Sequence, residues 1–490
     1  MAERTEQVDG VNGATPAPTP KRRGLEELFQ YPLMTALTER RTRRVARGVS
    51  VDSGELSWHS TNEPTPLSKL EEALLIVSTG ITGITIHDGP LMKPDGGQEL
   101  GTPFLNILAR AASSADNAQA TALFMINDEG IWLLKRPRGQ EALDLLGQFP
   151  QRWGDWTEDD WIAAAAAVKV RIWDKRLEFP RIFPYYLGWN KQLSNRPGTT
   201  IFFPVVDCTR QTINALLILL SEPDGQRPLF IDDWQPFRPK TPSDWVAWAG
   251  MKLRLLPDIP YHPIGGIRRA QSKFINKDNT IPLGAAHTMR TDHESFLLLQ
   301  NLMLLGQGMG LGGWIHSAVF PQYIFQRDEA KGWYGLGFRH AVPTVQHRRW
   351  PPVPASQAHP VGIDGVLEGL CPPYVTSLDD AVEQVLAEKH GAQGAYADRG
   401  IFARSYRSAA SGEAYLRHAA PHPPGAIKYT KEICNYIYET YGRFPAHIDA
   451  FYTPGIWLQF SHLEMEYYEQ FYDPALFRQQ ARHDELWDRD

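Results

Sequence analysis

The feature that most constrains this chain is a long apolar segment from Ser295 to Leu311. Its apolar side chains recur at helical spacing and form one broad face: Phe296, Leu297, Leu299, Leu302, Met303 and Leu305. A helix with so wide an apolar face must be buried on most sides, which requires a large folded domain. The segment leads into closely spaced glycines: Gly308, Gly310, Gly312 and Gly313. Glycine permits positive φ and close backbone approach, and a helix C-cap explains only one of them.

The rest of the chain mixes helical and strand patterns irregularly, so we predict an α+β fold. Helices are expected at Leu25–Arg47 (followed by a turn), Pro66–Ser78, Thr102–Ala112, Asp159–Lys175, Leu378–Lys389 and Tyr429–Tyr441. Strands are expected at Thr200–Val206 and Trp333–Phe338, and a hairpin at Ala120–Ile126 and Ile131–Leu134 around Asn127–Gly130. Gln211–Leu220 suits a buried helix or a strand, and the stretch from Lys389 to Gly425 suits loops.

Composition limits the environment and the partners. The formal charge is -6 with basic residues spread along the chain, so no general field would attract nucleic acid. The three cysteines lie far apart, which favours a reducing, cytoplasmic location over a disulfide framework. Residues 1–24 are polar and predicted to be a disordered tail. Elsewhere no apolar stretch approaches the roughly 20 residues that span a membrane.

A basic run at Arg40–Arg44 is the first candidate binding motif. In an extended backbone, Arg40, Thr42 and Arg44 point to one side and can reach one anion. Two guanidinium groups and a hydroxyl suit a phosphate monoester, since charge-assisted bidentate contacts are strong and directional. The alternative is a solvated basic face, which is the commoner meaning of such a run.

A polar loop from Ser113 to Gln119 is the second candidate motif. Asn117 and Gln119 each offer a donor and an acceptor, so together they can bind the edge of a heterocycle that carries both. Taken alone, an ordinary loop between a helix and the predicted hairpin is the commoner meaning of such a segment.

The order of these three pieces resembles the FMN-dependent nitroreductase family. That family has a helix ending in Arg-Arg-Ser/Thr-x-Arg, a Ser-x-x-Asn-x-Gln loop entering a strand, and a late apolar helix ending in Gly-Leu-Gly. The match is closest from Leu298 to Gly312 and spans Leu25 to Arg349. This chain departs from the family in having Ala120-Thr121 after the Gln, where Pro-Trp is usual, and in being more than twice as long as typical members.

The resemblance implies which residues would hold FMN. Arg40, Thr42 and Arg44 would bind its phosphate and ribityl chain, and Ser114, Asn117 and Gln119 would lie along the ribityl and ring edge. Backbone around Gly312 and Gly313 would complete the site, with Arg348 or Arg349 as a further phosphate ligand. NAD(P)H would be the electron donor, and a flat, electron-poor molecule such as a nitroaromatic, a quinone or a specialised heterocycle would be the acceptor.

The resemblance also implies a nitroreductase-like fold, in which helices flank a central, mostly antiparallel sheet. Residues 25–136 and 283–371 would form the core of that fold, and the aromatic-rich segment 137–282 would be an insertion or lid. Residues 372–490 would be a C-terminal extension that embraces a second subunit, as a homodimer with flavin at the interface. The dense aromatic residues from Arg443 to Tyr472 agree with such packing.

Two other functions remain open from the sequence. The chain would be a structural or interaction protein if the fold had lost its flavin. It would be a metal-dependent enzyme if His462 and Glu466, which lie four apart, shared a helix face and ligated a metal. A solvated helix face is the commoner meaning of that pair, and we assign no metal ligand.

Overall fold

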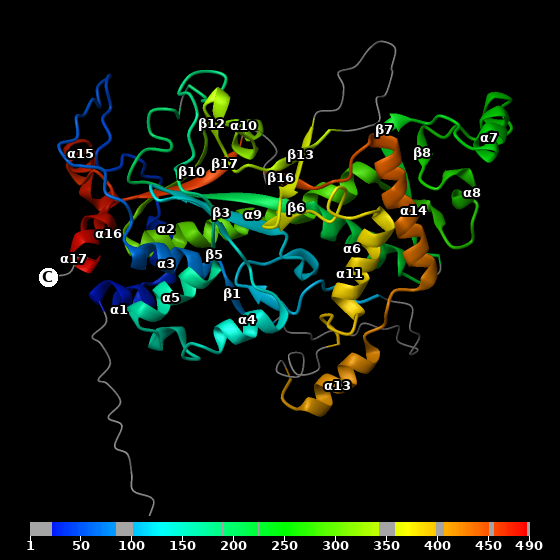
Figure 1. Cartoon of the computed structure of the whole chain (residues 1–490), viewed down its shortest axis with the longest axis horizontal. Helices are drawn as coiled ribbons and strands as arrows, with labels where there is room; N and C mark the ends of the chain where they lie inside the picture. Colours follow the sequence, from blue (N-terminus) through cyan, green and yellow to red (C-terminus); the bar gives the residue numbers. More distant parts are fainter. Residues whose placement is uncertain are drawn as a thin grey trace, which may run out of the picture.

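The computed structural model describes residues 22–84, 101–188, 190–223, 225–342, 358–397, 406–449 and 455–487. Figure 1 shows strands running across the middle of the molecule, with a long helix, α9, along them and further helices at both ends. The main sheet is antiparallel, and helices and strands alternate irregularly along the chain. The predicted α+β class is therefore confirmed.

The N-terminal segment forms two short helices where the sequence pattern predicted one helix and a turn. Helix α1 spans Arg23–Gln30 and α2 spans Leu33–Glu39, with Pro32 at the N-cap of α2. Proline disfavours helical backbone in the residue before it and lacks an N–H, so the helix is interrupted there. After Glu39 the chain becomes extended. Of the expected tail at 1–24, residues 1–21 lie outside the described part of the chain.

Helix α3, Lys69–Ser78, confirms the helix predicted after Pro66 and begins with a capping box. The Ser68 hydroxyl accepts a hydrogen bond from the Glu71 amide at 3.3 Å, and the Glu71 carboxylate accepts one from the Ser68 amide at 2.7 Å. These reciprocal bonds satisfy two amides that the first turn leaves unpaired. Every residue from Leu70 to Val77 is buried, so α3 lies inside the fold.

The main sheet contains strands from the whole length of the chain. Its strands are β3 (Thr121–Asn127), β4 (Gly130–Leu134), β5 (Lys169–Trp173), β6 (Thr200–Asp207), β10 (Gly312–Ser317), β16 (His447–Asp449) and β17 (Ile456–Ser461). They lie in the order β10-β17-β6-β3-β4-β5, with β16 also paired to β6, and all pairs are antiparallel. The predicted hairpin is confirmed as β3 and β4, where Asn127 faces Gly130.

Four of these strands come from segments outside the expected nitroreductase-like core, β5 and β6 from 137–282 and β16 and β17 from 372–490. In the sheet, Leu458 of β17 faces Phe202 of β6 on one side and Ile315 of β10 on the other. Both segments therefore contribute strands to the main sheet.

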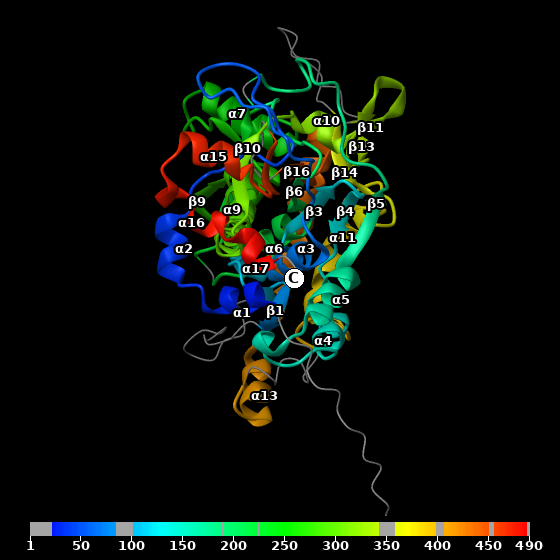
Figure 2. The same ribbon diagram turned by 90° about the vertical axis from the view of Figure 1, so that its left-hand side faces the viewer.

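Helix α9, Leu283–Met309, is the long apolar helix predicted from the sequence, and it begins earlier than expected. It contacts α3, α6 (Cys208–Leu220), β6 and β10. Gly310 ends it in the left-handed conformation with φ 78°, which glycine adopts without steric cost. Figure 2 shows the C-terminal helices α16 and α17 close to α1, α2 and α9, and α16 contacts α9 while α17 contacts α1.

The remaining elements surround this core. The other α-helices are α4 (Gly139–Leu146), α5 (Glu158–Val168), α7 (Pro242–Lys252), α8 (Gly266–Ala270), α10 (Pro321–Phe325), α11 (Leu378–His390), α13 (Ala409–His418), α14 (Pro424–Tyr441), α15 (Met465–Phe471), α16 (Arg478–Ala481) and α17 (His483–Trp487). Short 3-10 turns are η1 (Ala115–Asn117), η2 (Trp153–Asp155), η3 (Glu329–Lys331) and η4 (Pro474–Leu476). The small sheets contain β1 (Ile81–Ile84), β2 (Leu108–Arg110), β7 (Pro228–Pro236), β8 (Tyr261–Pro263), β9 (Asn276–Pro282), β11 (Arg327–Asp328), β12 (Trp333–Tyr334), β13 (Arg339–Ala341), β14 (His359–Ile363) and β15 (Leu367–Glu368).

The prediction of a helix at Thr102–Ala112 is wrong. Only the short strand β2 forms there, because the backbone bonds to the 114–119 loop instead of to itself. The side chains of Asn106 and Asn117 each donate to the other residue's carbonyl, at 2.9 and 2.6 Å, and the Leu105 amide donates to the Asp116 carbonyl. These bonds replace the hydrogen bonds that a helix would have made.

Three other elements differ from those predicted from the sequence. The segment Gln211–Leu220, which suited either a helix or a strand, is part of helix α6. The helix predicted at Asp159–Lys175 ends at Val168, because alternating β-branched residues then favour β5. Helix α13 lies in a stretch predicted as loops. The strand predicted at Trp333–Phe338 is only β12, because Gly335 packs against the Gln326 carbonyl and ends the pairing.

Within the described residues, no helix is long and apolar enough to cross a membrane.

Candidate functional site

The basic motif at Arg40–Arg44 follows α2 as an extended segment. Arg43 turns inward and is buried, where its guanidinium donates to the Arg41 carbonyl at 3.1 Å and to the Gln307 side chain at 3.4 Å. Burial lowers the pKa of Arg43 to about 10. Thr42 and Arg44 are exposed and Arg40 is half-buried. The three predicted anion ligands therefore remain on the accessible side, while Arg43 fixes the segment to α9.

The glycine-rich motif lies directly beside this segment. A Cβ atom at Gly312 would lie 3.3 Å from the Arg43 carbonyl oxygen and 2.1 Å from a Leu463 methyl carbon. At Gly313 it would lie 2.9 Å from the Phe460 ring. These glycines are needed because β10 packs closely against its neighbours. The guanidinium carbon of Arg44 lies 5.7 Å from the centroid of the Trp314 ring, within cation–π range. The first and third sequence motifs thus come together.

The 114–119 loop and the residues after it are hydrogen bonded to Glu294 of α9, which was not among the site residues predicted from the sequence. The Glu294 carboxylate accepts hydrogen bonds from the Ser114 hydroxyl at 2.6 Å and from the amides of Ala120 and Thr121 at 3.1 and 2.8 Å. Arg110 lies 3.7 Å from the same carboxylate. Glu294 is 2% exposed, so these partners are what stabilise a charge there.

Within this loop the side chains of Ser114 and Asn117 are already engaged. The Ser114 hydroxyl also accepts from the Gln119 amide at 2.8 Å, and the Asn117 side-chain oxygen accepts from the Gln119 side chain at 2.7 Å. Gln119 is 5% exposed, and its Oε1 is buried with no hydrogen-bond partner among the described residues. Gln119 is therefore the member of the motif that has an acceptor to spare.

The same loop holds an unusual backbone. Asp116, Asn117 and Gln119 have φ values of 52°, 47° and 52°, all in the left-handed region. Asn and Asp adopt that region more readily than most residues, whereas Gln gains nothing from it. Such conformations cost about 1 to 3 kcal/mol each and cluster at binding sites. The bonds to Glu294 hold this loop in place.

The two groups of motifs contact α9 at different levels, one near its C-terminal end and one near its middle. Arg43 contacts Gln307 near the C-terminal end, and Ser114 contacts Glu294 nearer the N-terminal end. At 1.5 Å per residue, the two contact points are about 20 Å apart along the helix. Within one chain, Arg40, Thr42 and Arg44 therefore do not meet Ser114, Asn117 and Gln119. Arg348 and Arg349 lie outside the described residues.

A cavity of about 280 Å³ adjoins Gln119. Four arginines from three segments of the chain line it: Arg110, Arg136, Arg138 and Arg210. Three of them have carboxylate partners outside or at the edge of the cavity. Arg110 faces Glu294, Arg138 lies 4.0 Å from Glu388, and Arg210 is 3.0 Å from Glu388 and 3.2 Å from Asp207.

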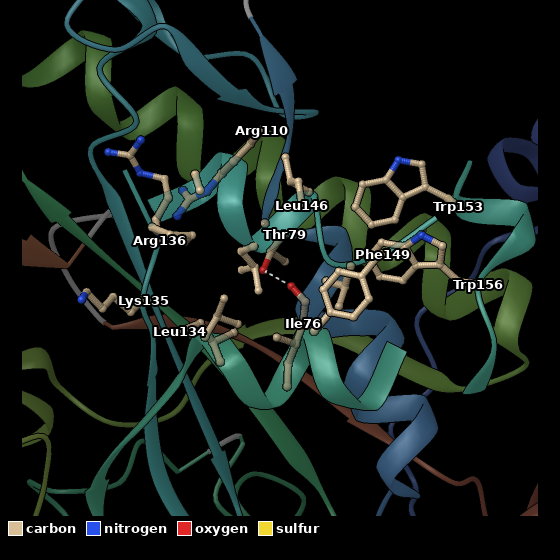
Figure 3. Close-up of a pocket in the computed structure, with 17 residues that line it drawn as sticks. Ile76, Thr79, Arg110, Leu134, Lys135, Arg136, Leu146, Phe149, Trp153 and Trp156 are labelled. Carbon is tan, nitrogen blue, oxygen red and sulfur yellow. Dashed lines mark hydrogen bonds between the residues drawn. The ribbon is translucent and has the colours of Figure 1, made fainter. Parts of the chain in front are cut away.

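A smaller apolar pocket of about 50 Å³ shares Arg110, Leu134, Lys135 and Arg136 with this cavity. Figure 3 shows Arg110 and Arg136 on one side of the pocket and the rings of Phe149, Trp153 and Trp156 on the other. The Trp156 ring centroid is 4.6 Å from that of Phe149 and 4.5 Å from that of Trp153, so the aromatic wall is closely packed. Sequence reasoning noticed the tryptophans of this segment but could not place them beside arginines.

The metal hypothesis based on His462 and Glu466 needs correction. His462 follows β17 outside any helix, while Glu466 is in α15, so the two do not share a helix face. Instead, Nε2 of His462 and Nε2 of His483 lie 3.1 and 2.6 Å from the Glu71 carboxylate. All three residues are buried, and their nearest ligand atoms lie within 4.8 Å of one another. Both Nε2 atoms are thus hydrogen bonded to Glu71, whereas Nδ1 of His462 is buried with no hydrogen-bond partner among the described residues.

None of the protein-family models, curated proteins or solved structures compared with this chain matches it.

Proposed function

We propose that this protein is an FMN-dependent oxidoreductase with a nitroreductase-like fold, and that it works as a homodimer. The observation that carries the proposal is the meeting of the Arg40–Arg44 and glycine-rich motifs at the C-terminal end of α9. Among the described residues, neither Arg40 nor Arg44 forms an ion pair with a carboxylate. Two cationic side chains are thus available beside a hydroxyl, the donor set suited to a phosphate monoester.

The residues present fit a flavin at both of its ends. Arg40, Thr42 and Arg44 would hold the phosphate of FMN. Gln119 Oε1, which lacks a partner, would accept from the ring N–H of the isoalloxazine. Ser114 and Asn117 are engaged with Gln119, so we assign them to positioning that amide.

The separation of these two ends supports a site shared by two copies of the chain. About 20 Å of α9 divides them, so we assign the two ends of one flavin to different copies of the chain. A two-fold axis that sets the α9 helices of two copies antiparallel would bring the arginine end of one copy to the Gln119 end of the other. Each dimer would then hold two equivalent sites.

An exposed apolar surface lies where such a dimer would form. On α1 and α2, Phe29 is 51%, Leu33 65% and Met34 66% exposed. On α9, Phe296 and Leu297 are 47% and 45% exposed. A groove of about 490 Å³ runs between α1, α2 and the C-terminal half of α9. Monomeric proteins rarely expose apolar side chains so densely, and the second copy of this chain is the occupant that also completes the flavin site.

Bound FMN would supply hydride or electron transfer between NAD(P)H and a flat, electron-poor organic acceptor such as a nitroaromatic or quinone. The contribution of this chain is to bind and orient. The arginines fix the phosphate, Gln119 fixes the ring edge, and the dimer surface excludes water from the ring.

Mixed dimers test the shared site directly. Arg44→Ala disables the phosphate end, and Gln119→Leu disables the ring end. If the site is shared, co-purified mixed dimers contain one intact site with both halves unaltered, so a random mixture of the two variants recovers about one quarter of the wild-type flavin content. Either variant alone recovers almost none. Arg417→Ala, an exposed arginine on α13, is the matched control and should retain full flavin content.

A mixture that recovers no more flavin than the single variants would contradict the shared site. Wild-type protein that takes up no FMN at all would contradict the flavin assignment itself and favour a structural or interaction role.

A further inference from the structure

The cavity beside Gln119 holds one more arginine than its carboxylate partners account for. Three of its four arginines, Arg110, Arg138 and Arg210, pair with Glu294, Glu388 and Asp207. Among the described residues Arg136 forms no ion pair or hydrogen bond, although it is half-buried. Two more carboxylates line the cavity, but Glu141 pairs with Lys135 and Glu368 is exposed and bonded to the Gly365 amide. One guanidinium is left without an anion.

The surroundings of Arg136 make this excess charge costly. Burial, followed by the positive charges of Arg138 and Arg110, lowers the pKa of Arg136 well below its usual value, and the negative charge of Glu294 only partly opposes this. A solvated basic face would not show this, because water and salt screen like charges that lie at the surface. A guanidinium held among like charges, with no carboxylate in ion-pair contact among the described residues, is typical of a site that receives an anion from a ligand.

The adjoining apolar pocket determines the rest of the ligand. It shares Arg110 and Arg136 with the cavity and is closed by Phe149, Trp153 and Trp156 (Figure 3). A simple inorganic anion would occupy the arginine side and leave this wall in contact with nothing. A ligand with an apolar group next to its charge would contact both walls.

Size limits the ligand to a compact molecule. A cavity of roughly 150 Å³ holds a benzene molecule. The arginine-lined cavity, at about 280 Å³, exceeds that, whereas the apolar pocket of about 50 Å³ admits only the edge of a ring or a short alkyl group. Together the two volumes suit a charged group that carries one small apolar group.

We propose that this double pocket binds a compact organic anion, a carboxylate or phosphate monoester that carries one small apolar group. Arg136 binds the anion, Arg110 and Arg138 surround it, and the aromatic wall contacts the apolar group. Arg110, Arg136, Arg138 and the aromatic wall are not assigned to the flavin. Gln119 is the one lining residue of the cavity that belongs to the proposed flavin site. Because Gln119 borders the cavity, an anion bound there would lie beside the ring end of the proposed flavin site.

Calorimetric titration with three probes tests this pocket. Phenyl phosphate carries both features, inorganic phosphate carries only the charge, and phenol carries only the ring. Phenyl phosphate should bind about tenfold or more tightly than inorganic phosphate, and phenol should not bind measurably. Benzoate serves as the carboxylate counterpart and should also bind more tightly than inorganic phosphate. The flavin content of every preparation is measured separately, so that loss of flavin is not mistaken for loss of anion binding.

The variant Arg136→Gln identifies the residue responsible. It should weaken phenyl phosphate binding about tenfold or more. Because Arg136 is repelled by its neighbours, its removal should leave the thermal midpoint of the protein without probe unchanged or raised. Arg152→Gln removes an exposed arginine that does not line either pocket and should change neither quantity.

Three results would overturn the proposal. These are equal affinity for phenyl phosphate and inorganic phosphate, unchanged affinity in Arg136→Gln, and a thermal midpoint of Arg136→Gln far below that of the wild type. The last result would mean that Arg136 serves the fold and not a ligand.

Discussion

Replacing His483 with glutamine should destabilise this protein in a pH-dependent way. Burial opposes a charge on His483, yet its hydrogen bonds to Asp484 and Glu71 raise its pKa from 6.5 to about 9. His483 is 8% exposed, so solvent screens this ion pair little. The same contacts act on Glu71 in the opposite direction. Burial raises the pKa of the Glu71 carboxyl, but the hydrogen bonds and charges of His462 and His483 outweigh this and hold it far below 4.5, so Glu71 stays ionised throughout the neutral range.

The magnitude follows from the shift. A rise from 6.5 to about 9 corresponds to about 3 kcal/mol, at 1.36 kcal/mol per pKa unit. Because the folded-state pKa is the higher one, this contribution is complete below pH 6.5 and disappears as the pH rises through 9. Glutamine can keep one hydrogen bond to Glu71 but carries no charge at any pH. The difference between wild type and His483→Gln should therefore be about 3 kcal/mol in mildly acidic buffer and small in alkaline buffer.

Denaturant unfolding of both proteins at several pH values measures this difference. His418→Gln, which changes an exposed histidine on α13, is the control for general effects of losing a histidine. A difference between wild type and His483→Gln that stays constant from below pH 6.5 to above pH 9 would refute the reasoning, because it would show that His483 acts by shape and not by charge.

Three further changes test other parts of the account. Replacing Arg40 and Arg44 together with alanine should weaken FMN binding by several kcal/mol, at about 1.5 to 3 for each charged hydrogen bond, and fluorescence titration with FMN measures it; undiminished flavin content would remove both residues from the site. Glu294→Gln should lower the unfolding free energy by about 2 to 4 kcal/mol, because it removes the negative charge that faces buried Arg110 and accepts hydrogen bonds from the loop amides. An unchanged denaturation midpoint would mean that other contacts hold the 114–119 loop. Met34→Glu places a charge on the exposed apolar surface and should shift the protein from dimer to monomer in sedimentation equilibrium, whereas a dimer of unchanged affinity would place the interface elsewhere.

The parts of the fold that depend on local pattern were predictable from the sequence. The helix α9 follows from the periodicity of its apolar residues, and the hairpin β3–β4 follows from its turn residues. Both signals come from residues that are close together in the sequence. The 102–112 segment was not predictable in this way. Its helical pattern is overridden by hydrogen bonds from Asn106 and Asn117 to a loop that precedes the sheet. A tertiary interaction of this kind leaves no signal in local spacing.

The candidate site shows the same division. Arg40, Thr42, Arg44 and Gln119 could be selected because their residue types recur at short spacing. Arg136 could not, since Arg-Pro-Arg after a strand has the pattern of a solvated turn.

The long-range partners could not be predicted at all. Only the folded chain places Glu294 against the 114–119 loop, or brings His462 and His483 from the C-terminal region to Glu71 in α3. Such pairings depend on topology, which residue spacing alone does not determine.

The measurement that tests the central proposal most directly is the visible absorption spectrum of the purified protein, before and after incubation with FMN, followed by chromatography of the chromophore released by heat. The account predicts flavin absorption bands and release of FMN, in about one equivalent per chain. A protein that stays colourless after incubation, with its fold intact, would contradict the flavin assignment and leave the anion pocket as the functional feature to pursue.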